Sequence, residues 1–215
     1  MKKFDIVILL FLFASIPSYA QQLKIGVKGG PGLVDVVAVR TPDGFGGEDS
    51  YYKMRPSYHF GVFGLIDLSS RFYVQTELLY ANKGFKSNDP GASEANIHLH
   101  YLTLPLLLSY KISENVHVAV GGELGYRLAA RSKFDNNNLD VNAIYKREID
   151  VGIDAGLQYY FSSQINLGVR YIHGLSNIFG RRGVLTDING NPFGKGPSFQ
   201  NRVVQFSVGY TFGDW

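Results

Sequence analysis

The stretch HYLTLPLLLSYKI (His100–Ile112) is apolar enough for a core segment or a membrane helix, yet Pro105 stands near its middle. Leucine occupies every even position from 102 to 108, whereas the odd positions mix hydroxyl and apolar side chains. Successive side chains of a strand point to opposite faces, so this period of two predicts a strand with one wholly apolar face. We expect a bulge at Pro105, because proline has no N–H for a ladder and a closed sheet has no free edge.

The last apolar stretch of the chain alternates in the same way. In VVQFSVGYTF (203–212), apolar residues such as Phe206 and Val208 fall on the even positions, and polar or small residues stand between them. EIDVGIDAGLQYYF and QINLGVRYIHG repeat the pattern, with charged residues such as Asp154 and Arg170 on the second face. One apolar face and one face of charges and small residues are typical of a membrane barrel with a narrow polar interior.

Extended along the chain, the alternation predicts about eight strands, an even number as in bacterial outer-membrane barrels. Their connections alternate between tight turns and long stretches rich in Gly, Asp and Asn. In such barrels the short turns are periplasmic and the long loops extracellular. The expected strands are 22–32, 57–68, 71–84, 96–111, 115–130, 146–161, 165–178 and 200–212.

A soluble β-sandwich is the alternative fold, because it too alternates apolar and polar residues. Several expected strands exceed the usual five or six residues, as a tilted membrane crossing requires. The expected fold class is therefore all-β, an antiparallel eight-stranded transmembrane β-barrel with short periplasmic turns and long extracellular loops. Asn189-Gly190 indicates a hairpin turn, so the last long loop is expected to project as a two-stranded ribbon.

The N-terminal stretch MKKFDIVILLFLFASIPSYA combines two lysines, a short apolar run and a small-residue exit, the pattern of a secretory signal peptide. We expect a signal peptide at 1–20 and a barrel domain at 21–215. Removal of the peptide changes Lys+Arg from 21 to 19 and Asp+Glu from 18 to 17, and the resulting net charge of +2 is too small to indicate nucleic-acid binding. The absence of cysteine excludes disulfides and thiolate metal sites.

Several segments resemble a known family. HYLTLPLLLSYKI is similar to the signature strand of the PorT-like outer-membrane β-barrel family common in Bacteroidetes. GGELGYRLAAR, EIDVGIDAGLQYYF and RYIHGLSNI resemble the segments that follow it, in the same order, and the resemblance extends from about Leu23 to Phe212. It implies an outer-membrane location, and the family's namesake takes part in type IX secretion. The end of the chain, TFGDW, departs from the family pattern, because Gly213 and Asp214 separate the strand from Trp215.

Charged side chains are expected to fill the lumen, since a barrel of about eight strands is just wide enough for side chains. They must pair, because an unpaired buried ion is costly. Asp154 falls diagonal to Arg170 across a tight turn and is its predicted partner. We expect the paired charges to form a structural plug of the lumen; the alternative is a pathway for protons or ions. Tyr101 and Tyr110 are expected at the two membrane interfaces. The expected lumen network is Lys28, Glu77, Glu123, Arg127, Asp154 and Arg170, and the expected lipid-facing residues are Leu102, Leu104, Leu106, Leu108, Phe206 and Val208.

Residues suited to catalysis or metal binding lack the neighbours that such chemistry needs. His98, His100, His173 and Ser176 fall toward the extracellular rim, but no nucleophile motif surrounds them. His98-x-His100 lacks a third metal ligand. We therefore expect no catalytic, cofactor or metal site. The expected role is a structural or surface-interaction barrel acting through its loops, with outer-membrane lipid and a protein partner at the loops. The alternatives are a component of a secretion complex and, third, a lipid-modifying enzyme.

Overall fold

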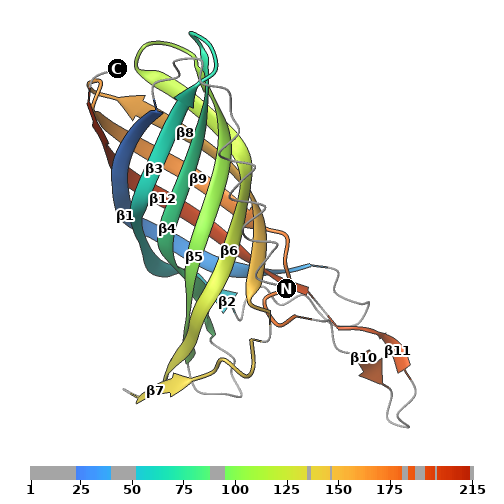
Figure 1. The fold of residues 1–215 in the computed structure, drawn as a ribbon. Coiled ribbons are helices and arrows are strands. Elements are labelled where there is room, and N and C mark those ends of the chain that lie inside the picture. Colours follow the sequence, from blue (N-terminus) through green and yellow to red (C-terminus); the bar gives the residue numbers. More distant parts are fainter. Residues whose placement is uncertain are drawn as a thin grey trace, which may run out of the picture.

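A computed structural model describes residues 23–39, 52–87, 95–134, 137–145, 147–180, 184–186, 192–196 and 198–213. Eight long antiparallel strands form one closed, tilted barrel, as predicted (Figure 1). Each strand pairs with the next barrel strand along the chain, and the last pairs with the first. The barrel strands are β1 (Leu23–Val39), β3 (Arg55–Asp67), β4 (Phe72–Ser87), β5 (Ala95–Lys111), β6 (Val116–Phe134), β8 (Ile149–Tyr160), β9 (Ile165–Gly174) and β12 (Ser198–Phe212).

Within the described ranges, no helix is long and apolar enough to cross a membrane. The predicted signal peptide lies outside the described residues.

One end of the barrel is closed by three tight turns, each built around a serine. The hydroxyls of Ser69, Ser113 and Ser162 each accept a hydrogen bond of 3.1 Å from the backbone N–H three residues later. Such local bonds favour turns over a continuing strand. The three turns fall at the predicted positions, and they mark the end that is periplasmic in outer-membrane barrels.

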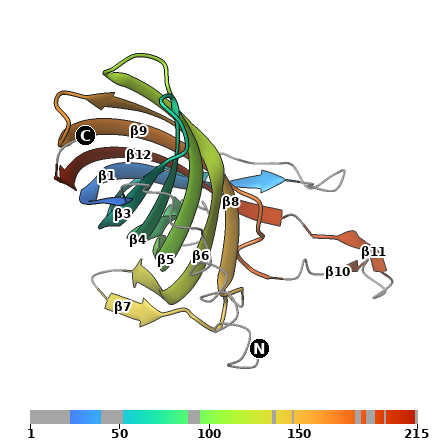
Figure 2. The same ribbon diagram turned by 45° about the horizontal axis from the view of Figure 1, so that its top comes forward.

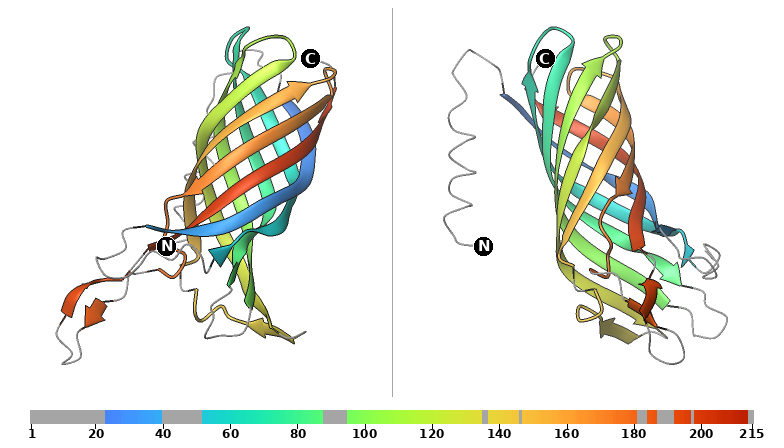
Figure 3. Two further views of the ribbon diagram at one scale, coloured as in Figure 1. Left: turned by 180° about the vertical axis from the view of Figure 1, so that it is seen from behind. Right: turned by 90° about the vertical axis from the view of Figure 1, so that its right-hand side faces the viewer.

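Four short strands lie at the opposite end of the barrel (Figures 1 and 3). The predicted ribbon is confirmed, because β10 and β11 pair antiparallel and stand away from the barrel wall. The turn expected at 189–190 lies outside the described residues. The short strands are β2 (Tyr52–Lys53), β7 (Asn137–Asp140), β10 (Val184–Thr186) and β11 (Pro192–Lys195).

Five predicted strand ends are wrong by three residues or more. Besides those of β1 and β9, β4 ends at Ser87 instead of 84, β6 ends at Phe134 instead of 130, and β8 begins at Ile149 instead of 146. β1 continues to Val39 instead of ending at 32, because it keeps its ladders with both neighbours and buries Val34 and Val36. β9 ends at Gly174 instead of 178, because the chain there leaves the wall and turns into the barrel mouth, where Ile178 is buried. Figure 2 shows the strands wrapping around one axis.

The bulge expected at Pro105 is also wrong. Pro105 pairs with Glu123 of β6 in an unbroken register. On the other side, the ladder with β4 has no pairs between Thr76↔Leu106 and Leu79↔Thr103 and resumes in the same register. The missing N–H is therefore accommodated by a short gap in one ladder rather than by an extra residue. The bulge of this strand pair lies nearer the extracellular end, at the register shift between His100 and Tyr101.

The two faces of β5 differ in the way that the alternation predicts. Thr103, Leu107 and Ser109 are at most 1% exposed. Tyr101 shares their face and is 1% exposed, so it packs inside the barrel and its expected place at a membrane interface is wrong. Six residues of the outer wall are between 40% and 56% exposed, and they are Leu102, Leu104, Leu106, Leu108, Phe206 and Val208.

Candidate functional site in the barrel lumen

Four charged residues from four strands meet inside the barrel and form what we call the lower charge cluster: Lys28, Glu77, Asp154 and Arg170. Arg170 donates two hydrogen bonds to the Glu77 carboxylate, at 2.9 and 2.6 Å, and Lys28 Nζ lies 3.0 Å from the same carboxylate. Asp154 Oδ2 lies 3.6 Å from the Arg170 guanidinium. Two cations face two carboxylates, and the planar fork of Arg170 matches one carboxylate edge.

The upper charge cluster lies nearer the extracellular end and consists of Lys83, Glu123, Asp150 and Asn201. Lys83 Nζ contacts Glu123 at 2.7 Å and Asp150 at 3.1 Å. Asn201 donates a hydrogen bond of 2.9 Å to the Asp150 oxygen that also binds Lys83. Within the described residues, the second oxygen of each carboxylate has no hydrogen-bond partner. This cluster therefore holds two carboxylates against one cation.

The structure brings together most of the predicted lumen residues, and the predicted ion pair of Asp154 with Arg170 is present at 3.6 Å, although Glu77 is the closer partner of Arg170. Arg170 is bonded to Glu77 across the lumen, and Asp154 is its more distant neighbour. Arg127 lies apart from both clusters, where it donates to Asn142 at 2.7 Å and to the Tyr145 carbonyl. Its role in the described part of the chain is to hold the segment before β8 rather than to join the ion pairs.

Sequence reasoning missed Lys83, the central cation of the upper cluster. It falls at the end of an expected strand, beside a stretch taken as loop. The alternation of side chains along the strand could have identified it, because Lys83 lies an even number of residues from Glu77 on β4 and therefore faces the lumen with it. Both are at most 2% exposed.

Polar side chains continue from the lower charge cluster to the short-turn end. Gln75 donates to Glu77 and accepts from Gln158 at 2.9 Å, and the Tyr160 hydroxyl donates to Gln158 at 3.1 Å. Beyond them, the ring of His117 packs against Tyr160 with its centroid 4.4 Å away. The lumen opens there into a hollow of about 500 Å³.

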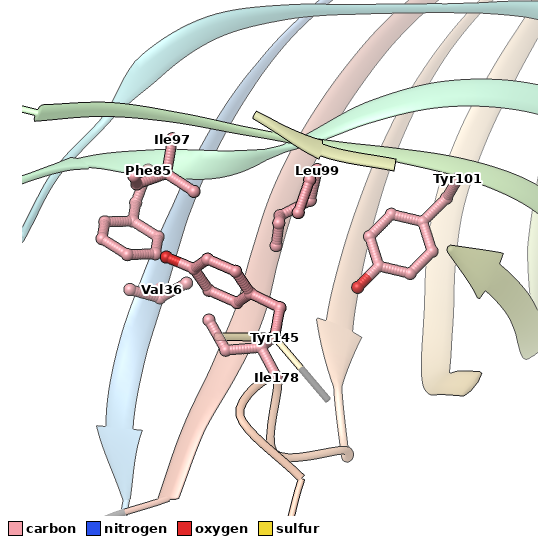
Figure 4. Close-up of a cluster of buried hydrophobic side chains, with 8 residues drawn as sticks. Val36, Phe85, Ile97, Leu99, Tyr101, Tyr145 and Ile178 are labelled. Atoms are coloured by element: carbon pink, nitrogen blue, oxygen red, sulfur yellow. The ribbon is translucent and has the colours of Figure 1, made fainter. Parts of the chain in front are cut away.

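A cluster of apolar side chains fills the barrel mouth above the upper charge cluster. Tyr145, which precedes β8, inserts its ring among side chains from the strands, and Ile178 approaches from the segment after β9 (Figure 4). Burial raises the pKa of the Tyr145 hydroxyl. We call this group the mouth cluster, and its buried members are Val36, Phe85, Ile97, Leu99, Tyr101, Ala130, Tyr145 and Ile178.

From the short-turn end, the lumen is thus filled by the polar side chains of Gln75, Gln158 and Tyr160, then by the lower charge cluster, the upper charge cluster and the mouth cluster. A hollow beside Lys28 and Arg170 has a volume of about 10 Å³. That is room for about one water molecule. A side-chain packing of this kind is suited to holding the wall rigid, since each buried ion keeps its partner only if the strands stay in place.

The residues considered for catalysis are not brought together. The Ser176 hydroxyl accepts a hydrogen bond of 3.0 Å from the Val151 N–H, and His173 lies 3.2 Å from the Tyr171 hydroxyl. His98 and His100 stack with their rings 6.4 Å apart. Within the described residues, no group of three or more His, Cys, Asp or Glu side chains is placed to hold a metal ion.

A closed antiparallel ring with an apolar outer wall, a polar interior and short turns at one end defines a small outer-membrane β-barrel protein. The chain belongs to the family described as outer membrane protein beta-barrel domain, which it matches over residues 19–180. It lies in the outer membrane.

Solved structures are similar to this chain at low sequence identity. Neisserial surface protein A is 10% identical, with 89% of this chain and 100% of that chain covered and a TM-score of 0.55. Ail of Yersinia pestis is 13% identical, covering 88% and 98%, with a TM-score of 0.47. OprG of Pseudomonas aeruginosa is 12% identical, covering 89% and 97%, with a TM-score of 0.46. No curated protein sequence matches the chain.

Proposed function

We propose that this protein is a closed, non-enzymatic barrel that anchors an extracellular binding surface in the outer membrane. The observation that carries the proposal is the filled lumen. Glu77, Arg170 and Lys83 cross it at two levels, and Tyr145 fills the mouth above them. A solute would have to break buried ion pairs to pass, and breaking one such pair costs roughly 3–5 kcal/mol.

The extracellular end offers the surface that such a role requires. β5 and β6 remain paired as far as Asn96 and Lys133, and β7 extends this sheet by pairing with β6. The ribbon of β10 and β11 stands away from the barrel wall. A rigid wall that carries projecting strands is a common way to present a binding surface.

Conductance in planar lipid bilayers tests the closed lumen. We expect the refolded protein to give no stable current, with a general porin as the positive control. A matched variant in which Glu77, Lys83, Glu123 and Arg170 are all serine should admit small ions if it folds. Stable conductance of porin size from the wild-type protein would overturn the proposal.

The binding surface is tested by shortening the ribbon. Replacement of residues 184–195 by a short Gly-Ser linker leaves every barrel ladder intact, so heat-dependent gel mobility should not change. Chemical cross-linking on intact outer membranes should then lose partners that the wild-type protein captures. An unchanged set of cross-links would contradict a binding role for the ribbon.

The resemblance to PorT-like proteins supports the second candidate, a component of a secretion or envelope assembly. Purification in mild detergent distinguishes the two. A stable complex with several envelope proteins, retained in the ribbon variant, would favour the assembly role over surface binding.

A further inference from the structure

A bulge in β6 changes which residues face the membrane near the extracellular end. The register with β5 shifts between His100 and Tyr101, which gives β6 one extra residue. Before the shift Leu128 is 52% exposed, and after it Ala130 is fully buried. Without the extra residue Arg131 would point into the lumen, as Arg127 does, because side chains alternate along a strand. With it, Arg131 points out from the wall.

The outward Arg131 borders a hollow on the outer wall. The hollow has a volume of about 250 Å³ and is lined by Tyr80, His100, Leu128, Ala129 and Arg131. The Tyr80 hydroxyl and His100 Nδ1 are hydrogen-bonded on one side of it. The site therefore combines one guanidinium, two further polar groups and an apolar floor.

Two cations of β6, Arg131 and Lys133, are exposed on this part of the wall. In the part of the chain that the structure describes, Arg131 has neither an ion pair nor a hydrogen bond.

The carboxylate opposite Arg131 forms no ion pair with it in the described residues. Asp140 stands opposite Arg131 in the pairing of β6 with β7. Its two oxygens accept hydrogen bonds from the backbone and the side chain of Asn142, at 2.8 and 3.2 Å. Asp140 keeps its negative charge, but the guanidinium donors of Arg131 are not used by it and can bind a further anion.

Aromatic side chains place the hollow at the level of lipid headgroups. Tyr80 packs against Tyr58 and Phe60, with ring centroids 6.1 and 5.2 Å away, and Tyr126 is 50% exposed. Aromatic girdles of this kind mark the membrane interfaces of barrels. The row of exposed leucines begins directly below, at Leu102. An occupant of the hollow thus has its polar part beside Arg131 and its apolar part along the leucines.

We propose that this hollow binds the phosphate group of a phosphorylated lipid of the outer leaflet. Arg131 holds the phosphate with its planar set of donors, and Lys133 adds a second positive charge from the same face of β6. Tyr80 and His100 supply further hydrogen bonds, and Leu128 packs against the first carbons of an acyl chain. The site is separate from the closed lumen and from the ribbon, so it does not depend on the proposed function.

The test measures lipid binding by the full-length protein refolded in detergent, with native mass spectrometry as the readout. The probes are diphosphorylated lipid A and the same lipid with its phosphates removed. We expect wild type to prefer the phosphorylated lipid and Arg131→Gln to bind it about tenfold more weakly, since a hydrogen bond to a charged group has about that effect. Arg131→Lys should fall between them. Arg147→Gln is the matched control, because Arg147 is an exposed cation outside the hollow.

Three results would overturn the site: equal binding of both lipids by wild type, unchanged binding by Arg131→Gln, or full displacement of the lipid by an equal concentration of inorganic phosphate. The last would indicate a site for the free ion. Heat-dependent gel mobility reports whether each variant folds. If Arg131→Gln does not fold, Lys133→Gln serves as the second variant, with a smaller loss of affinity expected and no loss contradicting the proposal.

Discussion

The lower and upper charge clusters share one lumen, yet they are built differently. In the lower cluster Lys28 and Arg170 both bind Glu77, whose two oxygens both accept hydrogen bonds, and Gln75 donates to it as well. In the upper cluster Lys83 alone faces two carboxylates, each with one oxygen that has no hydrogen-bond partner in the described residues. In the lower cluster two cations depend on the single carboxylate of Glu77, whereas in the upper cluster the carboxylates of Glu123 and Asp150 share the single cation Lys83. Substitution should therefore have very different effects in the two clusters.

Glu77→Gln should have the largest effect. It leaves Arg170 and Lys28 buried without their shared carboxylate, and a guanidinium does not give up its proton. We expect a loss of roughly 3–5 kcal/mol in the free energy of unfolding, measured in urea after refolding into lipid vesicles. Glu114→Gln, in an exposed turn, is the control and should resemble wild type. A Glu77→Gln protein as stable as the control would show that the lower cluster does not hold the wall.

Lys83→Met should come second, because it strands two carboxylates instead of two cations. The loss should be roughly 2–4 kcal/mol, smaller than for Glu77→Gln because Asn201 still donates a hydrogen bond to Asp150. Urea unfolding measures it, with exposed Lys53→Met as control. A Lys83→Met protein as stable as the control would show that Lys83 does not hold the upper cluster together.

The sequence shows the faces of these strands but not the partners across the barrel. Alternation assigns Glu77, Asp154 and Arg170 to one surface, and neighbouring strands suggest the pairing of Asp154 with Arg170. The closer contact joins β4 to β9 across the lumen. Such a pairing depends on strand tilt and stagger, which no local pattern encodes. Arg131 was equally hidden, since an extra residue in β6 reverses the faces that alternation assigns.

Asp154→Asn tests which carboxylate is the main partner of Arg170 in the lower cluster. Its oxygens make no hydrogen bond in the described residues, and its contact with Arg170 is 3.6 Å long, whereas Glu77 holds Arg170 at 2.6 Å. We expect a loss of about 1 kcal/mol, because Arg170 keeps its main partner. The measurement is the urea midpoint beside that of Glu77→Gln. Equal losses in the free energy of unfolding for the two variants would mean that Asp154 and Glu77 stabilise Arg170 equally, and the ranking of its partners would be wrong.

Glu123→Gln should have the smallest effect of the four, although Glu123 is as buried as Glu77. The amide oxygen of Gln can still accept the 2.7 Å contact from Lys83, and Asp150 remains to balance that cation. The change also removes the excess negative charge of the upper cluster, so the free energy of unfolding should stay within about 0.5 kcal/mol of wild type. The same conversion of Glu to Gln is therefore expected to be severe in the lower cluster and nearly silent in the upper one. If Glu123→Gln destabilises as strongly as Glu77→Gln, charge balance does not distinguish the clusters, and burial alone sets the effect.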